Sequence, residues 1–306
     1  MSSTATIAQL RVLMRSAVGA AKFEREKWSK ELTPILTLWK RLNQGSGMLQ
    51  IKLQQPGSDS ANEDPVRAFV ELEFFNAVSL LQAMHKALSG LSKVIRGSAL
   101  LDERVARLAD SLLRQETPGD WQKRWDGPEN PLDYINTVCS KAEEVQKWHS
   151  AANQQGGSVL QGELDLSDLF HPDTFLGALR QMTARDHGVS MDELRLASSW
   201  STNGIPSSRL MVRVQGLMME GAEFDGRKLT AAAHDSPTLT VVPTCAMAWV
   251  PGKESDGGSD GMTISLPLYY SNERDTIVAH LDLPCANGDQ DRWLQSGTVL
   301  FINSHI

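Results

Sequence analysis

The stretch GLMMEGAEFDG, residues 216–226, joins a strand-like apolar run to residues that turn the chain. Before it, RLMVRVQ (209–215) alternates apolar and polar side chains, as a half-buried strand does. Asp225 and Gly226 tolerate the positive φ of tight turns, so the pair predicts a hairpin. Gly221 inside the run predicts a bulge or a close approach of another backbone segment.

Glu220, in the middle of this stretch, is open to two interpretations. As a catalytic acid or base it would need a positioned partner such as a second carboxylate, and no obvious partner lies nearby in the sequence. As a structural residue it would end a strand, either exposed or bonded to the backbone. We favour the structural interpretation and keep an acid–base enzyme, using a distant carboxylate, as the least favoured hypothesis.

The pattern around this stretch has a period of two residues from position 194 onward, which is typical of strands. Six candidate strands lie at about 194–200, 209–219, 238–250, 262–271, 276–283 and 297–303. Turn-rich segments separate them and no helix of useful length intervenes, so neighbouring strands should pair antiparallel. The pattern predicts a small barrel or a sandwich.

The first half of the chain reads as helical, because apolar residues recur every three or four positions. Residues 69–95 predict a long helix, whereas residues 48–53 alternate and predict a short strand. A helix around Pro34 requires this proline to lie in its first turn. Pro172 and Gly188 mark the start and the end of a further helix. The predicted fold class is therefore α+β.

Length and composition are those of a globular protein. The 306 residues suffice for one large domain or two ordinary ones, and 41% are hydrophobic. The net charge of −7 argues against general nucleic-acid binding, which needs a basic face. Residues 1–57, however, hold nine Lys or Arg against three Glu. We expect a solvated helix face there, with docking onto an acidic partner surface as the alternative.

The cysteines and the apolar segments indicate the compartment. Cys139, Cys245 and Cys285 have neither zinc-site spacing nor a CxxC pair, so we expect reduced thiols in a cytosolic protein. No window approaches about 18 continuous apolar residues, and the N-terminus lacks the pattern of a signal peptide. The sequence predicts a soluble intracellular chain that does not contact a membrane.

The residue patterns of known catalytic and ligand sites are not found. GKES (252–255) comes nearest to a phosphate loop, but lacks the first glycine and the hydroxyl residue of that pattern. HDS (234–236) has the residue types of a catalytic triad, but adjacent residues cannot assemble one. The seven histidines show no metal-site spacing, and His171 before Pro172 is expected to lead into a helix. We predict no catalytic, cofactor-binding or metal-binding residue and no enzyme activity.

The tryptophans could form a core or a docking surface. Three lie on apolar faces and are expected in the core: Trp39, Trp148 and Trp200. Three others lie beside predicted loops: Trp121, Trp125 and Trp293. For these a core position is favoured, and docking is the alternative because Trp is enriched in interface hot spots.

Several stretches, in this order, resemble the C-terminal end of dynein heavy chains. In that family a strand ends in Gly-Leu and is followed by Glu-Gly-Ala, an aromatic residue and Asp. Here these positions are Gly216, Leu217, Glu220, Gly221, Ala222, Phe224 and Asp225. Later matches are Pro267 and Tyr269, Leu281 and Pro284, and finally Trp293 and Gly297. Residues 170–185 are similar to the helix that precedes the family's sheet.

One branch of the family, the intraflagellar-transport dynein called cytoplasmic dynein 2, matches better than the others. The stretches concerned are 75–97, 120–135, 165–175 and 291–301. The resemblance implies that residues 1–115 are the helical end of the sixth AAA+ module with its exit helix. It also implies that residues 116–306 are the C-terminal domain, with helices at 131–188 and an incomplete antiparallel barrel at 194–303.

By resemblance, the chain would cap and brace the AAA+ ring of an ATP-driven minus-end microtubule motor for retrograde intraflagellar transport. Its partners would be AAA+ modules of the same heavy chain and, through the parent complex, intermediate chains, light chains and transport trains. It would act in the cytoplasm, cytoskeleton and cilium, and would reach the microtubule only through a stalk outside these residues. We expect a fragment, a truncated gene product or a stand-alone copy.

A different class of function is the alternative. A stand-alone β-sandwich with a helical arm could bind a protein or a small ligand through exposed tryptophans. Such a recognition module requires that the tryptophans beside the loops lie on the surface.

Overall fold

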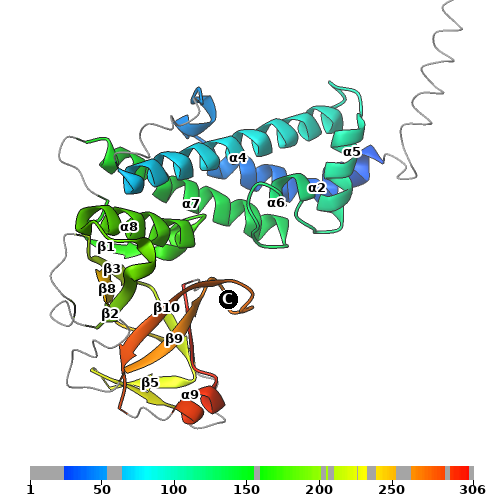
Figure 1. Ribbon diagram of the computed structural model, residues 1–306. Helices are drawn as coiled ribbons and strands as arrows, with labels where there is room; N and C mark the ends of the chain where they lie inside the picture. Colours follow the sequence, from blue (N-terminus) through cyan, green and yellow to red (C-terminus); the bar gives the residue numbers. More distant parts are fainter. Residues whose placement is uncertain are drawn as a thin grey trace, which may run out of the picture. The chain divides into compact units, whose positions relative to one another are not determined.

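The computed structural model describes residues 24–53, 64–154, 159–200, 205, 210–225, 227–232, 239–252, 263–286 and 290–302. Within these ranges the chain forms seven α-helices and eleven strands, so the α+β class is confirmed (Figure 1). The chain divides into two compact units, residues 1–55 with 75–143 and residues 56–74 with 144–306. Two helices, α4 (Pro65–Arg96) and α7 (Pro131–Ala152), contribute residues to both units.

The first unit is helical. Its other helices are α2 (Arg25–Leu42), α5 (Glu103–Leu113) and α6 (Gly119–Gln122). The buried residues of α2 follow helical spacing and form one apolar face: Trp28, Leu32, Ile35 and Trp39. The Arg25 guanidinium donates to the Ile95 carbonyl over 2.6 Å, and the Trp39 indole donates to His85 over 3.3 Å. These two contacts fasten both ends of α2 to α4.

Two local predictions in this unit are wrong. Pro34 lies in the middle of α2 rather than in its first turn. The lost backbone bond is tolerated because the burial of apolar residues on both sides of Pro34 outweighs its cost. Residues 48–53 form no strand: Gly47–Gln50 is the 3₁₀ helix η1, and the Gln82 side chain donates to the Ile51 carbonyl over 2.8 Å. A side chain therefore occupies a carbonyl that a neighbouring strand would have used.

The second unit places one long helix against a sheet. Helix α8 (Pro172–His187) begins at Pro172 and ends at Gly188, which has φ 64°, as predicted. It packs on strand β8 (Cys245–Pro251). A single 3₁₀ turn, η3 (Met191–Glu193), follows the helix. The segment before α8 holds β1 (Glu163–Asp165) and the 3₁₀ turn η2 (Leu166–Asp168).

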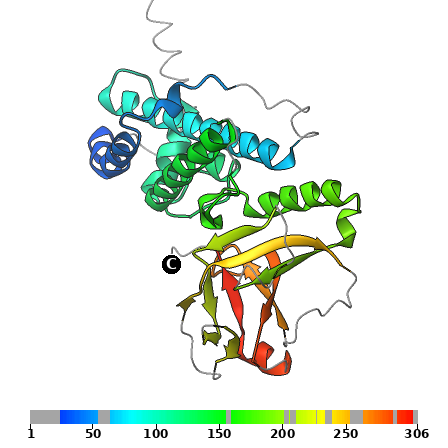
Figure 2. The ribbon, with the colours of Figure 1, turned by 90° about the vertical axis from the view of Figure 1, so that its left-hand side faces the viewer.

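The sheet has nine strands in the order β1-β3-β8-β2-β10-β9-β11-β4-β7, and it curls into an incomplete barrel (Figure 2). The strands besides β1 are β2 (Leu194–Ser199), β3 (Val212–Gln215), β4 (Met218–Glu220), β7 (Thr240–Val241), β8 (Cys245–Pro251), β9 (Thr263–Tyr269), β10 (Ile277–Pro284) and β11 (Val299–Phe301). The short helix α9 (Gln290–Ser296) precedes β11.

Two further strands, β5 (Ala222–Phe224) and β6 (Leu229–Ala231), pair by themselves as the predicted hairpin. The Asp225 carboxylate accepts from the backbone N–H groups of Arg227 and Lys228 over 2.8 and 2.7 Å. These bonds hold the turn and lower the pKa of Asp225. The expectation of turn chemistry at Asp225 is confirmed, whereas Gly226 lies outside the described residues.

The sheet differs from the prediction in pairing and strand number. Among the described residues, three of the nine strand pairs are parallel, namely β1 with β3, β2 with β10 and β9 with β11. The expected strand 209–219 is split into β3 and β4 at Gly216, which has φ 76°. The expected strand 238–250 is split into β7 and β8. Gly216 lies at the first break and Pro243 at the second, and both residue types commonly interrupt strands.

Candidate functional site

The side chain of Glu220 is paired with an arginine. Its Oε2 atom lies 3.0 Å from Nη2 of Arg274, and the two side chains are 32% and 39% exposed. Arg274 lies in the turn between β9 and β10, where it has φ 58°, and its guanidinium covers the ring of Phe301 at 5.8 Å. Because β11 lies between β9 and β4, the arginine reaches over β11 to bind Glu220. This ion pair gives Glu220 a structural role.

Gly221 is the point at which the chain leaves β4 and enters β5. Its φ is 76°, and a Cβ atom placed on it would lie 2.4 Å from the Ser296 carbonyl oxygen and 3.0 Å from the Thr298 backbone. The Gly221 carbonyl accepts bonds from the Thr298 hydroxyl over 2.8 Å and from the Ala232 N–H over 3.0 Å. The predicted close approach is therefore confirmed, and the approaching segment is the one that leads into β11.

Strand β11 is enclosed on both sides. It pairs antiparallel with β4, where Leu300 faces Met219, and parallel with β9, where Leu300 faces Leu268. Leu300 and Phe301 are 0% and 1% exposed. Strand β11 is thus held in the sheet next to the corner at Gly221 and beneath the ion pair of Glu220 with Arg274.

The structure also contains a polar site around Glu73 that the sequence patterns did not predict. Glu73 of α4 is 2% exposed, yet its carboxylate accepts from the Phe170 N–H over 3.0 Å and lies 2.6 Å from Nδ1 of His171. His171 is the N-cap residue of α8, so Glu73 also lies at the positive end of that helix. Buried charges need such partners, and here the partners join the first turns of α4 to α8.

Helix α8 is joined to the sheet by Trp249 of β8. The indole N–H donates to the Leu176 carbonyl of α8 over 2.9 Å, and the Arg180 guanidinium covers the indole ring at 4.9 Å. With Glu73 at one end and Trp249 on one side, α8 connects α4 to the sheet within the second unit.

The three tryptophans beside the predicted loops do not form a docking surface, because all three are buried. Trp121, Trp125 and Trp293 are 2%, 6% and 3% exposed. The Tyr134 hydroxyl donates to the carbonyls of both Trp121 and Trp125 over 3.0 Å, and burial raises the pKa of this tyrosine. Trp39 is also buried, as expected, whereas Trp148 and Trp200 are half-buried. The hypothesis of a recognition module required these tryptophans to lie on the surface, and they do not.

The cysteines are buried and are not paired with one another. Burial raises the pKa values of Cys139 and Cys245 to about 12, so both thiols stay protonated at neutral pH. Within the described ranges, no group of three His, Cys, Asp or Glu residues could hold a metal ion. The segments 234–236 and 253–255, which were considered for catalysis and phosphate binding, lie outside the described residues.

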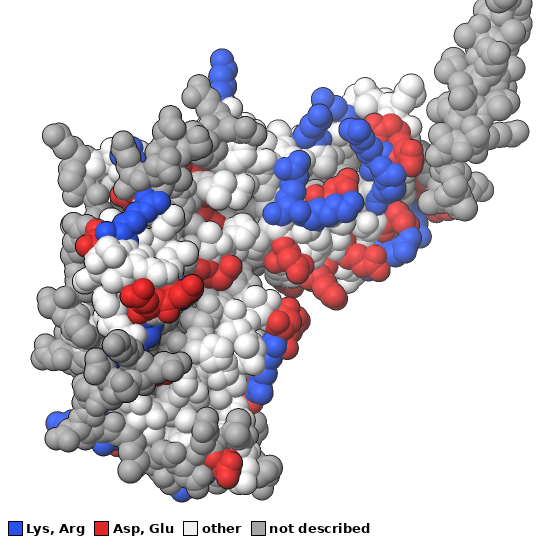
Figure 3. Space-filling view, in the orientation of Figure 1, with Lys and Arg blue, Asp and Glu red and all other residues white. Residues whose placement is uncertain are grey.

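The surface of the helical unit carries both signs of charge (Figure 3). On α5, Arg107 pairs with Glu103 at 2.8 Å, and Arg114 at the C-cap of this helix pairs with Asp110; all four side chains are exposed. Exposed pairs of this kind contribute little to stability. In the described part of the chain, no helix combines the length and the apolar character needed to cross a membrane.

Comparison with known proteins agrees with the resemblance described above. The family model for the C-terminal domain of dynein heavy chains matches residues 1–302. Cytoplasmic dynein 2 heavy chain 1 of Tripneustes gratilla is 47% identical over 302 residues, which is 99% of this chain and 7% of that protein. The human protein of the same name is 44% identical over 304 residues, with the same shares.

Similarity to another dynein is lower. The cytoplasmic dynein heavy chain of Drosophila melanogaster is 25% identical over 296 residues, which cover 95% of this chain and 6% of that protein. The predicted likeness to the dynein 2 branch is therefore confirmed. The chain spans about 7% of the length of the dynein 2 relatives.

Proposed function

Since the chain belongs to the family of C-terminal domains of dynein heavy chains, we propose that it is the non-catalytic C-terminal part of a dynein-2-like heavy chain. In this role it caps and braces the AAA+ ring of an ATP-driven motor that moves toward microtubule minus ends and performs retrograde intraflagellar transport. The proposed setting is the cytoplasm, the cytoskeleton and the cilium.

The observation that carries the proposal is the similarity to cytoplasmic dynein 2 heavy chains along 99% of the chain. The structure supports a bracing role, because α4, α8 and the sheet are joined through Glu73 and Trp249. Glu220, the residue considered for acid–base chemistry, is held by Arg274. In this proposal residues 1–115 belong to the sixth AAA+ module, residues 116–306 form the C-terminal domain, and intermediate chains, light chains and transport trains are reached through the parent complex.

A chimeric motor tests the role directly. The matching C-terminal residues of human cytoplasmic dynein 2 heavy chain 1 would be replaced by this chain, and microtubule gliding and microtubule-stimulated ATP hydrolysis would be measured. We expect both activities to be retained, and to be lost in a chimera that carries Gly221→Val. A correctly assembled chimera with no more activity than a heavy chain lacking these residues would contradict the proposal.

Nucleotide binding by the isolated chain tests the non-catalytic part of the proposal. The sequence holds no complete phosphate-loop pattern, so the purified chain is expected neither to bind ATP nor to hydrolyse it. Isothermal titration calorimetry with Mg-ATP should give no saturable heat. Saturable binding at micromolar affinity would refute the non-catalytic assignment.

A further inference from the structure

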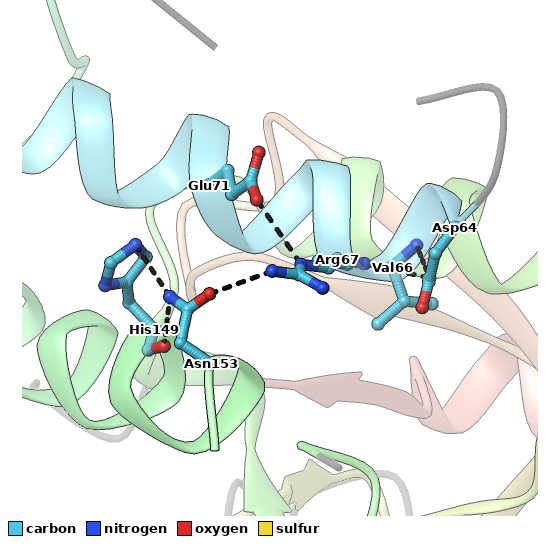
Figure 4. A network of polar contacts seen from close by, with 6 residues as sticks. All are labelled: Asp64, Val66, Arg67, Glu71, His149 and Asn153. Carbon is cyan, nitrogen blue, oxygen red and sulfur yellow. Dashed lines mark hydrogen bonds and ion pairs between the residues drawn. The ribbon is translucent and has the colours of Figure 1, made fainter. Parts of the chain in front are cut away.

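A series of hydrogen bonds connects the last turn of α7 to the first turns of α4 (Figure 4). His149 lies in the last turn of α7 and Asn153 follows that helix directly, whereas Arg67 and Glu71 lie near the start of α4. All four belong to the second unit. Asp64 caps α4 by accepting from the N–H groups of Val66 and Arg67 over 3.0 Å, which fixes the turn that carries Arg67.

The Asn153 amide can face only one way in this series of bonds. Its Oδ1 atom accepts from Nη2 of Arg67 over 3.1 Å, and a guanidinium has donors but no acceptor. Its Nδ2 atom must therefore face His149, where it donates to the His149 carbonyl over 2.9 Å and lies 3.1 Å from Nε2 of the ring. An amide NH₂ has only donors, so Nε2 must accept and cannot carry a proton.

The surroundings of His149 also favour the neutral ring. The imidazole stacks on Phe74 of α4, with the ring centres 4.0 Å apart and the planes 9° from parallel. Burial lowers the pKa of His149, Glu71 opposes this effect, and Arg67 adds to it. Glu71 is itself bound to Arg67, at 3.4 Å. Among the described residues, the charged groups that act on the pKa of the ring are Arg67 and Glu71, both on α4.

We propose that His149, Asn153 and Arg67 form a proton-sensitive link between α7 and α4, which is closed when the imidazole is neutral and opens when it is protonated. A proton on Nε2 would point at the two hydrogens of the Asn153 amide. Turning the amide would offer its oxygen to the imidazolium, but would then set its NH₂ group against the Arg67 donor. No orientation of Asn153 satisfies both neighbours. In the present orientation the amide NH₂ repels the protonated ring from its place against Phe74, and in the turned orientation the bond to Arg67 is lost, so either way a contact between α7 and α4 is lost.

The direction of the pH effect follows from the lowered pKa. In the unfolded chain His149 titrates near its ordinary value of 6.5, and in the folded chain it titrates below that value. Between the two values the unfolded state binds more protons, so the free energy of unfolding falls as the pH falls. The contribution of the link is present above pH 6.5 and is lost below the folded pKa.

The tautomer of His149 is the first test. The full chain would be labelled with ¹⁵N in its imidazoles, and the His149 signal would be assigned by its loss in His149→Phe. At pH 8 we expect the ring proton on Nδ1 and a bare Nε2, the less common tautomer of a free imidazole, and a pKa below 6.5. A proton on Nε2 at pH 8 would overturn the proposal.

Hydrogen exchange is the second test. Protection of the amides in the last turn of α7, corrected for the intrinsic pH dependence of exchange, should fall as the pH drops through the His149 pKa. The fall should reach about tenfold for each unit by which the pKa is lowered. His149→Phe keeps an aromatic ring against Phe74 but cannot titrate, so its protection should not vary with pH. The same fall in His149→Phe would assign the effect to another group and refute the link.

An isosteric variant provides a third test, which does not depend on replacing the histidine. In Asn153→Asp both carboxylate oxygens accept, so one can bind Arg67 while the other binds a protonated Nε2. The pKa of His149 should then rise above 6.5 and the link should stay closed at low pH. Gln154→Glu is the matched control, because it adds the same charge one residue later. Equal shifts of the pKa in the two variants would show a general charge effect and contradict the proposed bond.

Discussion

A side chain at position 221 would collide with the backbone that leads into β11. Gly221→Ala adds a carbon 2.4 Å from the Ser296 carbonyl oxygen, in addition to the strain of φ 76°. We expect a loss of about 3 kcal/mol in the free energy of unfolding, the upper end for strained positions, measured by urea denaturation. Gly188→Ala is the control: its φ is 64°, but no atom in the described part of the chain lies within 4 Å of the added carbon.

The control should lose only about 1–2 kcal/mol, the cost of a left-handed backbone for a residue with a Cβ atom. The difference between the two alanine variants then measures the contact with residues 296–298. Equal losses in Gly221→Ala and Gly188→Ala would show that the terminal segment can move aside, and that Gly221 is needed only for its backbone angle.

The carboxylate of Glu73 should contribute strongly to stability. In Glu73→Ala the Phe170 N–H and the His171 ring lose their buried partner, and leaving a buried donor without an acceptor costs about 1–3 kcal/mol. Glu103→Ala is the comparison, because Glu103 forms an exposed pair with Arg107 and should contribute less than about 1 kcal/mol. Thermal unfolding monitored by circular dichroism distinguishes the two variants. Similar melting temperatures would show that water replaces the lost carboxylate of Glu73.

The sequence contained a signal for Glu73 but none for the partner of Glu220. Glu73 interrupts the apolar stripe of α4 between the buried residues Val70 and Ala77, and a charge in such a position requires a partner. The partner of Glu220 is Arg274, which is 54 positions later in the sequence. Only the pairing of β9, β11 and β4 brings the two together, and no local pattern encodes that pairing.

At the scale of elements, β11 should be essential for the fold of the sheet. Removing residues 290–306 deletes the strand that pairs with both β4 and β9. Each large buried side chain that is lost, such as Trp293, Leu300 or Phe301, removes roughly 1.5–3 kcal/mol. A whole domain has only about 5–15 kcal/mol of stability, so we expect an insoluble or molten 1–289 chain. The measurements are solubility and near-ultraviolet circular dichroism.

The comparison for this truncation is removal of Ser304–Ile306, which leaves every described strand in place and should be tolerated. The prediction of the terminal strand from the sequence was right in position, since residues 297–303 include β11. Because β11 has a partner on each side, its removal exposes the edges of both β4 and β9. A soluble 1–289 chain that melts cooperatively would show that β4 and β9 can close without β11.

Element type was easier to predict than element pairing, for a physical reason. Long helices such as α4 and α8 reveal themselves through many apolar repeats and through end residues such as Pro172 and Gly188. Strands of three residues, such as β1 and β5, are too short to show an alternation. Parallel pairs such as β9 with β11 join distant segments, and their register depends on the whole sheet.

At the scale of the whole molecule, the two units share α4 and α7. Each helix is continuous in the described structure, yet its residues divide between the units. Unfolding of either unit must therefore release part of a helix on which the other depends. This continuity predicts one cooperative transition rather than two.

The three buried thiols can report on this cooperativity. Cys139 lies in the first unit, and Cys245 and Cys285 lie in the second. Because the thiolate is the reactive form and burial raises the pKa values of Cys139 and Cys245 to about 12, the native chain should not react with a thiol reagent at pH 8.

Two variants would be compared in increasing urea, one that retains only Cys139 and one that retains only Cys245, with alanine at the other cysteines. Because the units share two helices, we expect labelling to begin at the same urea concentration in both variants, once each midpoint is corrected for the stability lost in its alanine substitutions. Midpoints that remain separate after this correction would show that one unit unfolds while the other stays folded, and that α4 and α7 can fray at the division without loss of either core.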